Sequence, residues 1–228
     1  MNWDDTGFLI SKLKYNENSV IADFFSLDHG KTSGIIFGAS SKKIKGYLQI
    51  GNKFHINCNF KNDSKIGAIK PEILNPNTPF YFNDKKKLHS IISAMSMVKL
   101  LTAENQKNEK IYELIENFFS ILKKDDWIKF YLFWELELLK LLGYDLDLSK
   151  IVKKSKIRNG YEYYVESSSE KKIVPNFLIE NQTNNFDNKE LIKGYNLVTN
   201  YLEKNILMPN NINQPFQRLD FINLLKWF

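Results

Sequence analysis

The chain contains very little cysteine and very little arginine. Its one cysteine, Cys58, allows neither a disulfide framework nor a cysteine-based zinc site within 228 residues, which is typical of proteins in a reducing compartment. Only two of its 32 basic residues are arginines, Arg158 and Arg218. Because paired hydrogen bonds from arginine are the commonest way to read guanine, we expect any nucleic-acid contact to address backbone phosphates rather than base edges.

Signals for membranes and for secretion are also missing. The residues from Met1 to Asp5 lack the basic segment and the apolar stretch of a signal peptide. No apolar run approaches the roughly 20 residues that are needed to span a bilayer. We therefore expect a cytoplasmic protein that has no membrane partner.

The chain does contain apolar residues and positive charge. Hydrophobic residues make up 43% of the sequence and aromatic residues 14%, which is too much for a disordered protein. The formal net charge is +6, and residues 1–70 hold ten lysines against six acidic residues. A positive excess of this kind is compatible with a polyanionic partner.

Residues 3–74 show the pattern of a small β-barrel. Short segments rich in β-branched and aromatic residues alternate with turn residues. In residues 54–60 apolar and polar residues alternate strictly, which gives one apolar face. Five short strands without helical periods between them favour an OB-type barrel. The predicted strands lie near residues 7–13, 20–27, 35–37, 54–60 and 66–73, with turns at 16–18, 28–30 and 62–63.

The remainder of the chain is predicted to be mainly helical, so that the fold class is α+β with two domains. Three prolines between Pro71 and Pro79 indicate a linker. The predicted domains are an OB-fold at 1–74, a linker at 75–82, and a helical domain at 83–228. Within the helical domain, residues 144–185 lose the helical period and are predicted to form a β-hairpin lobe around a turn at 167–169.

The helical period returns over residues 84–101, 108–123, 125–143, 187–207 and 215–227. Asn83 or Asp84 is expected to cap the first of these helices and Asp125 the third, and Gly143 is expected just after the end of a helix. The third of these helices carries Trp127 and Trp134 on one apolar stripe. We expect this helix to be buried at the centre of its domain.

The sequence shows no set of residues with the spacing of a catalytic site. His29, His55 and His89 lie in a turn, on a strand and in a helix, without the spacing of metal ligands. Glu135 and Glu137 are two residues apart on a predicted helix, so they face different directions and do not form a carboxylate pair. These five residues therefore give no support for an enzyme.

Three further candidates have ordinary explanations. Asp145 and Asp147 follow a helix end and could bind a divalent metal, although exposed acids in a loop are the commoner case. Cys58 lies on the apolar face of an alternating strand, where a thiol packs as a small hydrophobic group. Residues 34–42 lack both the spacing and the ending of a phosphate-binding loop. We expect no catalytic residue, no metal and no cofactor.

Lysines remain as candidates for a binding site. Lys42, Lys43 and Lys45 cluster beside Ser40 and Ser41 in a segment that we predict to be a loop. OB barrels bind single strands along one face and its flanking loops, with cations on phosphates and aromatic rings on bases. The alternative is a solvated surface without a ligand. The predicted DNA-binding residues are Lys12, Lys14, Lys31, Lys42, Lys43, Lys45 and Lys53.

Four stretches, taken in order, resemble the bacterial recombination mediator RecO, especially its alphaproteobacterial members. Gly7 to Ile10 followed by Tyr15 to Ser19 resembles the opening strand of the family and its Tyr-Gly-Glu-x-Ser turn. Phe25 to Lys31 resembles its Phe-Thr-x-Glu-His-Gly-Lys segment. Gly38 to Lys42 and Leu48 to Gly51 resemble its Gly-Ala-Arg-Ser loop and the Leu-Gln-Pro-Gly that follows, with Ser40 or Ser41 in place of the loop arginine.

The helical part continues the resemblance. Residues 134–144, followed by Leu-Asp-Leu at 146–148, resemble the family's Trp-Glu-x-x-Leu-Leu-x-x-Leu-Gly-Phe and Leu-Asp-Leu. Some relatives carry a four-cysteine zinc lobe after this point, but Ile151 and Val152 stand where the first cysteine would be expected. We therefore treat residues 144–185 as a degenerate form of that lobe and predict no zinc.

The resemblance implies an OB-fold joined to a helical domain, and a DNA repair mediator that acts at the nucleoid without catalysing a reaction. It implies binding of single- and double-stranded DNA and annealing of complementary strands. It also implies partnership with RecR and with the acidic, hydrophobic C-terminal tail of single-stranded-DNA-binding protein, so that RecA can be loaded onto the coated strand.

Two other functions are compatible with the residues alone. An OB-fold factor for RNA or the ribosome would prefer RNA over DNA of the same sequence through contacts to the 2′-hydroxyl. A metal-dependent hydrolase that uses Asp145 and Asp147 would need Mg²⁺ or Mn²⁺ for activity.

Overall fold

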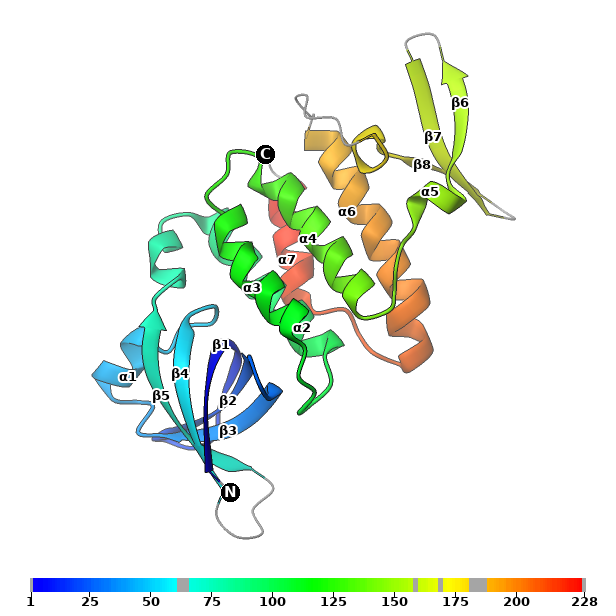
Figure 1. The fold of residues 1–228 in the computed structure, drawn as a ribbon. Coiled ribbons are helices and arrows are strands. Elements are labelled where there is room, and N and C mark those ends of the chain that lie inside the picture. Colours follow the sequence, from blue (N-terminus) through cyan, green and yellow to red (C-terminus); the bar gives the residue numbers. More distant parts are fainter. Residues whose placement is uncertain (1, 61–65, 158–159, 168–169, 181–187, 227–228) are drawn as a thin grey trace. The chain divides into compact units, whose positions relative to one another are not determined.

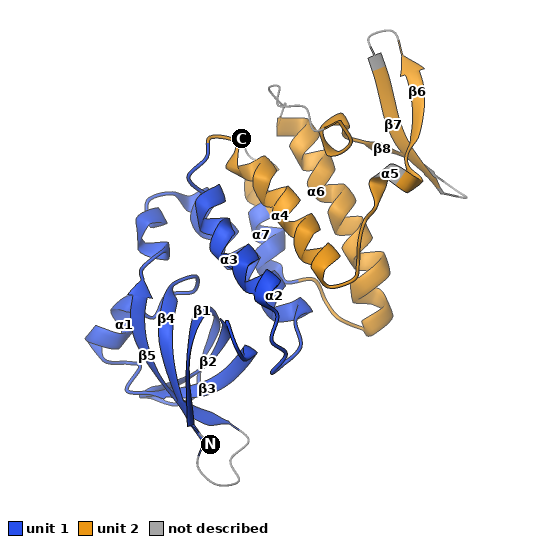
Figure 2. Cartoon of the chain, in the orientation of Figure 1, with its two compact units in different colours: residues 1–124, 215–221 blue, residues 125–214, 222–228 orange. Residues whose placement is uncertain are grey.

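The computed structural model is an α+β protein with a five-stranded barrel, several helices and a three-stranded sheet (Figure 1). It forms two compact units (Figure 2). Unit 1 comprises residues 1–124 and 215–221, and unit 2 comprises residues 125–214 and 222–228. The residues that the structure describes are 2–60, 66–157, 160–167, 170–180 and 188–226. The predicted turn at 62–63, and most of the one at 167–169, lie outside them.

The barrel in unit 1 has the closed strand order β1-β2-β3-β5-β4. Its strands are β1 (Asn2–Lys14), β2 (Ser19–Ser26), β3 (Gly30–Phe37), β4 (Lys53–Asn59) and β5 (Gly67–Asn75). β1 pairs antiparallel with both β2 and β4, and the barrel closes through parallel pairing of β3 with β5. This confirms the predicted five-stranded OB fold. β1 begins earlier than predicted because its first residues pair with β4, Asn2 opposite Asn59.

The interior of the barrel follows from the alternation along the strands. Phe54, Ile56 and Cys58 of β4 are fully buried, as their period of two predicts. Each such large apolar side chain stabilises the fold by roughly 1.5–3 kcal/mol relative to an exposed one. The buried residues of this core are Leu9, Ala22, Phe24, Ile36, Ala39, Leu48, Phe54, Ile56, Cys58 and Ile69.

The connection between β3 and β4 contains a short helix, α1 (Lys42–Tyr47). The prediction of a loop at Lys42 to Lys45 is therefore wrong. The hydroxyl of Ser41 caps this helix by accepting a hydrogen bond from the N–H of Ile44. Ile44 and Tyr47 then pack against the barrel core, which stabilises a helix too short to be stable by itself.

Two longer helices complete the described part of unit 1 before residue 124, after a 3₁₀ turn η1 (Thr78–Tyr81). They are α2 (Lys85–Leu101) and α3 (Glu109–Ile121). Asp84 caps α2 by accepting from the N–H of Lys87 at 3.0 Å, and Asn108 caps α3 by accepting from the N–H of Ile111 at 3.1 Å. Unit 1 thus combines the barrel with α2 and α3. The linker predicted at 75–82, between an OB domain and a helical domain, stays a prediction.

Unit 2 contains helices and a small sheet. Its elements are α4 (Trp127–Leu141), α5 (Leu148–Ile151), β6 (Lys153–Ile157), β7 (Gly160–Ser167), β8 (Glu170–Val174), η2 (Asn176–Leu178), α6 (Asn188–Leu202), η3 (Glu203–Leu207) and η4 (Met208–Asn210). The last helix, α7 (Phe216–Lys226), contributes residues to both units. None of the helices among the described residues has an apolar stretch long enough to cross a bilayer.

The helix α4 buries its apolar stripe, as predicted. Trp127 and Trp134 are almost completely buried, and Gly143 follows the helix with a φ of +84°. The expected N-cap at Asp125 is wrong, because the helix begins one residue later and Asp126 occupies the N-cap position without a side-chain hydrogen bond. The N-cap residue could not be chosen from sequence, because the two acids are adjacent.

The predicted hairpin lobe is present as β7 and β8, and β6 adds a third antiparallel strand. Leu148, Tyr163 and Val174 form a small apolar core in this region. Side-chain packing therefore holds this sheet against its neighbouring segments.

Candidate nucleic-acid interface

Five of the seven predicted lysines lie at one end of the barrel. Lys12 and Lys14 lie among the last three residues of β1, and Lys42, Lys43 and Lys45 lie in α1. All five residues are exposed. We call these five the end lysines.

A hollow of about 310 Å³ separates the β1–β2 hairpin from α1, and three end lysines line it: Lys12, Lys14 and Lys45. Although Lys12 is exposed as a whole, partial burial of its ammonium lowers its pKa, and the ammonium of Lys45 lowers it further. The ammonium of Lys12 also donates to the carbonyl of Leu48. Glu17 is the one acidic residue in the lining. An anion in this hollow would relieve the repulsion between the ammonium groups.

Hydrogen bonds hold the walls of the hollow in place. The N–H of Ala39 donates to the carbonyl of Asn18 at 2.9 Å, and the hydroxyl of Ser40 donates to the side chain of Asn18 at 2.5 Å. These bonds connect the tip of the β1–β2 hairpin to the segment that leads into α1. The end lysines are thus presented by a fixed backbone and not by a free loop.

Exposed apolar side chains lie at the ends of β1 and β3, and the sequence-based site prediction did not include them. Leu13 is 69% exposed, Tyr15 is 57% exposed and Phe37 is 62% exposed. The signal that could have found them is an aromatic residue on either side of a predicted turn or strand end. Their relation to one another depends on strand register, which the sequence does not reveal.

The other two predicted lysines have partners inside unit 1. The ammonium of Lys31 donates to the carbonyl of Lys99 at 3.0 Å and lies 3.4 Å from the carboxylate of Glu104. The ammonium of Lys53 lies 2.6 Å from the carboxylate of Glu116. The side chains of Lys31 and Lys53 are only 12% and 17% exposed. We call these two the clasped lysines.

The surroundings of Lys53 favour its charged form. Burial opposes the charge, but hydrogen bonds to Glu116 and Tyr112 outweigh it and raise the pKa of Lys53. The ammonium also lies about 5.5 Å from the ring centroids of Phe8 and Tyr112. Contact between DNA and any of the seven lysines remains a prediction, but the two clasped lysines already have partners in the fold.

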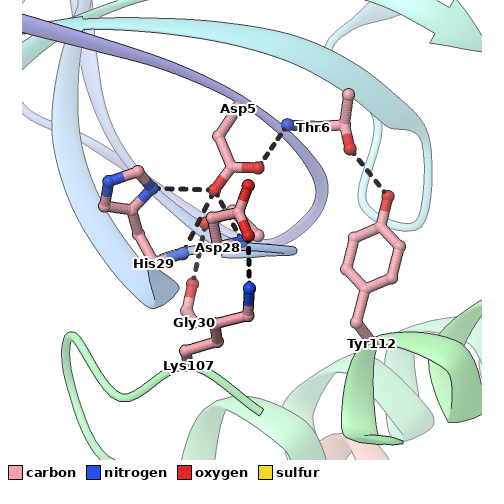
Figure 3. A network of polar contacts seen from close by, with 8 residues as sticks. Asp5, Thr6, Asp28, His29, Gly30, Lys107 and Tyr112 are labelled. Carbon is pink, nitrogen blue, oxygen red and sulfur yellow. Dashed lines mark hydrogen bonds and ion pairs between the residues drawn. The ribbon is translucent and has the colours of Figure 1, made fainter. Parts of the chain in front are cut away.

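A buried carboxylate organises the turn between β2 and β3 (Figure 3). Asp5 accepts hydrogen bonds from the ring Nδ1 of His29 at 2.8 Å, and from the N–H groups of Asp28 at 3.0 Å and Thr6 at 2.7 Å. Burial would raise the pKa of Asp5, but these bonds, with one from Ser26, outweigh burial and lower it. Asp5 is therefore a charged acceptor that fixes the turn.

The same turn is joined to the segment between α2 and α3. Asp28 forms an ion pair with Lys107, and the N–H of Asn105 donates to the carbonyl of Lys31 at 2.8 Å (Figure 3 shows the ion pair). Gly30 has a φ of +66°, and a Cβ there would lie 1.9 Å from the carbonyl oxygen of Gln106. Only glycine allows this approach. The contacts from Asp5 to Lys107 thus hold the barrel and its helices together.

The pairing of Asp5 with His29 has the geometry that hydrolases use to orient a general base. Here the ring of His29 stacks on Trp3, with centroids 3.9 Å apart, and the carboxylate serves the backbone of the turn. Cys58 is buried, and burial raises the pKa of its thiol to about 11. Within the described residues no group of three or more His, Cys, Asp or Glu side chains could hold a metal ion. The geometry therefore favours a structural role for these residues.

The acids of the rival hydrolase hypothesis lie in unit 2. Asp147 pairs with Lys150 at 2.8 Å, three residues further on. Asp145 has its carbonyl, rather than its carboxylate, in a hydrogen bond with the hydroxyl of Tyr201. Two acids with one neighbouring lysine form a poor divalent-metal site.

Unit 2 also contains a groove of about 440 Å³. Its apolar lining comes from α5, the small sheet and α6, and includes Leu148, Ile173 and Leu197. Three lysines also line it: Lys172, Lys193 and Lys204. An apolar surface bordered by cations suits a peptide that carries both apolar and acidic side chains.

Comparison with known proteins gives one consistent result. The family model described as "Recombination protein O N terminal" matches residues 1–77, and the one described as "Recombination protein O C terminal" matches residues 83–209. Among curated relatives, the DNA repair protein RecO of Rickettsia akari is 30% identical over an aligned length of 237 residues, which covers 99% of this chain and 98% of the relative.

Two other relatives match over a shorter length. The DNA repair protein RecO of Wolbachia pipientis (strain wPip) is 31% identical over 152 residues, and that of Rickettsia canadensis is 33% identical over 150 residues. Each match covers 66% of this chain and 62% of the relative, which is less than two thirds of the relative's length.

Proposed function

The chain belongs to the RecO family of DNA repair proteins, and from that premise we propose that it is a recombination mediator. It binds single- and double-stranded DNA, anneals complementary strands, and acts with RecR to load RecA onto strands coated with single-stranded-DNA-binding protein. It does so in the cytoplasm, at the nucleoid, without catalysing a reaction.

The arrangement of the end lysines is the observation that carries this proposal. Lys12 and Lys14 of β1 share a hollow with Lys45 of α1, and Lys42 and Lys43 extend the charge along the same helix. Ammonium groups placed together in this way attract phosphates and release their counterions. Two strands that are held by one cluster of cations repel each other less, which permits annealing.

The groove in unit 2 supports the proposed contact with the tail of single-stranded-DNA-binding protein. An acidic and hydrophobic tail would place its apolar side chains on Leu148 and Leu197, and its carboxylates near Lys193 and Lys204. A well-buried apolar anchor contributes roughly 1 kcal/mol or more to such a complex. The proposal therefore gives the two units different tasks, with DNA on the barrel and a protein tail on unit 2.

Annealing of precoated strands tests the proposal. Complementary oligonucleotides coated with single-stranded-DNA-binding protein are mixed with the purified chain, and duplex formation is followed by fluorescence. We expect faster annealing with the intact coating protein than with a version that lacks its C-terminal tail. If the chain does not anneal strands in either case at low salt, the proposal is wrong.

The groove is tested in the same assay by K193E/K204E. We expect this variant to lose the advantage that the tail gives, while it keeps its annealing of uncoated strands. The exposed pair Lys150 and Lys153, which carries the same charge in unit 2 outside the groove lining, provides the control K150E/K153E. A preference for RNA over DNA of the same sequence would instead favour the RNA- or ribosome-binding alternative.

A further inference from the structure

Tyr15, the first residue after β1, and Phe37, the last residue of β3, lie in one row on either side of Ser19, the first residue of β2. Phe37 of β3 pairs with Ser19 of β2, and the N–H of Tyr15 donates to the carbonyl of Ser19 at 3.0 Å. Residues that are directly opposite in antiparallel strands present their side chains on the same face. The backbones of Tyr15 and Phe37 are therefore separated by two strand spacings, which is about 10 Å.

The row continues along the outer surface of the barrel. Two residues earlier on β1, Leu13 is opposite Ile21, and Ile21 is opposite Ile35. Because side chains alternate along a strand, these three share the face of Tyr15 and Phe37. Leu13, Tyr15 and Phe37 are 57–69% exposed, and Ile21 and Ile35 are half-buried. Several large apolar side chains on one exposed face indicate a binding surface.

The opposite face of the same strand ends carries charge. Lys14 is opposite Val20, and Val20 is opposite Ile36, a residue of the barrel core. Lys14 therefore points to the inner side of the strand end, towards the hollow that it lines with Lys45. One edge of the hairpin thus separates an aromatic surface from a cationic hollow.

We infer that Tyr15 and Phe37 form a stacking platform for the unpaired bases of a single strand whose phosphates lie on the end lysines. This inference rests on the proposed DNA binding and adds the chemical class of group that the outer face recognises. Charge complementarity selects this occupant, because the hollow beside the platform carries three lysines against Glu17 and so favours a polyanion over an apolar protein partner. Stacking uses the flat face of a base, which every base has.

The platform would allow the protein to distinguish single strands from duplexes. The bases of a duplex are stacked on each other and cannot offer a free face to Tyr15 or Phe37. A base that lies flat on a ring keeps its hydrogen-bonding edge free. A strand held in this way can be read by a complementary strand before it leaves the protein, which fits annealing.

Binding to two oligomers tests the inference. A dye-labelled thymidine oligomer of about 20 nucleotides is compared with an abasic oligomer that has the same number of phosphates, by fluorescence anisotropy at low salt. We expect the unaltered chain to bind the thymidine oligomer at least about tenfold more tightly. The variant Y15A/F37A should lose most of this difference and should bind the abasic oligomer within about twofold of the original affinity.

Two further variants control for the loss of aromatic surface. Phe80 and Phe82 are 80% and 53% exposed and lie outside the row, so F80A/F82A should keep the preference for bases. Y15F/F37Y keeps both rings and should keep the preference as well. A strand that contains 5-bromodeoxyuridine should crosslink to Tyr15 or Phe37 under ultraviolet light, as mapped by mass spectrometry.

Each contrary outcome has a distinct meaning. Equal binding of the two oligomers by the unaltered chain overturns the stacking platform and leaves the proposed DNA binding intact. A folded Y15A/F37A that loses affinity for both oligomers equally also overturns it. If neither oligomer binds, both the inference and the proposed function are wrong.

Discussion

The end lysines and the clasped lysines belong to the same barrel but have opposite surroundings. Lys12 lies near another cation, and its pKa is lowered by burial and by Lys45. Lys53 lies near a carboxylate, and although burial opposes its charge, the hydrogen bonds to Glu116 and Tyr112 raise its pKa. The comparison shows that the neighbours of a lysine, and not its place in a basic segment, decide whether its charge already has a partner in the fold.

The two groups of lysines differ because the helical part of unit 1 places acidic residues beside only one of them. Glu104, which follows α2, and Glu116 of α3 lie next to Lys31 and Lys53. The end lysines have only Glu17 in the lining of their hollow. A positive surface without matching carboxylates is available to phosphates, whereas an ion pair must first be broken.

Charge reversal of α1 should have the largest effect. We expect K42E/K43E/K45E to weaken binding of a single strand on the order of a hundredfold at low salt, because phosphate contacts are lost and like charges are introduced. The melting temperature should stay within a few degrees. The measurement is fluorescence anisotropy with a labelled oligonucleotide.

A matched control separates this effect from a change in net charge. Lys85, Lys110 and Lys123 are exposed residues of unit 1 outside the barrel. K85E/K110E/K123E alters the net charge by the same amount and should change the affinity by only a few-fold. Equal losses in the two variants would mean that α1 is not a specific part of the site.

Removal of the charge of Asp5 should affect stability and leave binding unchanged. Asp5→Asn replaces an acceptor of several hydrogen bonds, so we expect the free energy of unfolding to fall by about 2 kcal/mol. Asp4→Asn, at an exposed neighbouring position, should cost much less. Urea denaturation followed by circular dichroism measures both.

The pH dependence of stability has a definite sign. The pKa of Asp5 in the folded chain lies below its ordinary value of 3.8, because the hydrogen bonds outweigh burial. Its contribution is therefore present above about pH 4 and is lost as the pH falls through the folded pKa. Asp5→Asn should remove this part of the acid destabilisation. A variant as acid-sensitive as the original chain would show that Asp5 carries no such role.

Substitution of a clasped lysine should have a smaller effect on stability. Lys53→Met keeps the apolar stem and removes the ion pair, and we expect a loss of about 1 kcal/mol. Oligonucleotide affinity should change by less than about twofold. Lys70→Met, at an exposed position of β5, is the control. A tenfold loss of affinity in Lys53→Met with unchanged stability would place Lys53 in the interface and remove the distinction between the two groups of lysines.

The smallest expected effect concerns a single end lysine. Because burial and Lys45 lower the pKa of Lys12 below 10.5, this ammonium loses its proton at a lower pH than an ordinary lysine. Binding of a phosphate favours the charged form, so affinity should decline by a few-fold as the pH approaches 10. Lys12→Met should bind more weakly at pH 7 and show a flatter decline. Identical pH profiles would contradict this role.

Much of the barrel could be predicted from its sequence. The alternation of Phe54, Ile56 and Cys58 is a local signal, and so are the turns that divide the strands. The short helix α1 was missed because six residues contain less than two turns of helical period, and its stability comes from the Ser41 cap and from the packing of Ile44.

The division of the lysines could not be predicted in this way. Lys53 and Glu116 are 63 residues apart in the sequence, and only the folded chain brings them together. The row of Tyr15 and Phe37 likewise depends on the register of β1, β2 and β3. Local patterns identify strands and helices, whereas partners across the fold depend on long-range packing.

The salt dependence of oligonucleotide affinity tests the central claim most directly. If the end lysines hold phosphates by electrostatic attraction, the logarithm of the association constant should fall steeply and linearly with the logarithm of the salt concentration. The slope for K42E/K43E/K45E should be shallower by about 2, since each phosphate contact on a single strand contributes about 0.7. A slope near zero for the unaltered chain, or the same steep slope in both proteins, would contradict the account.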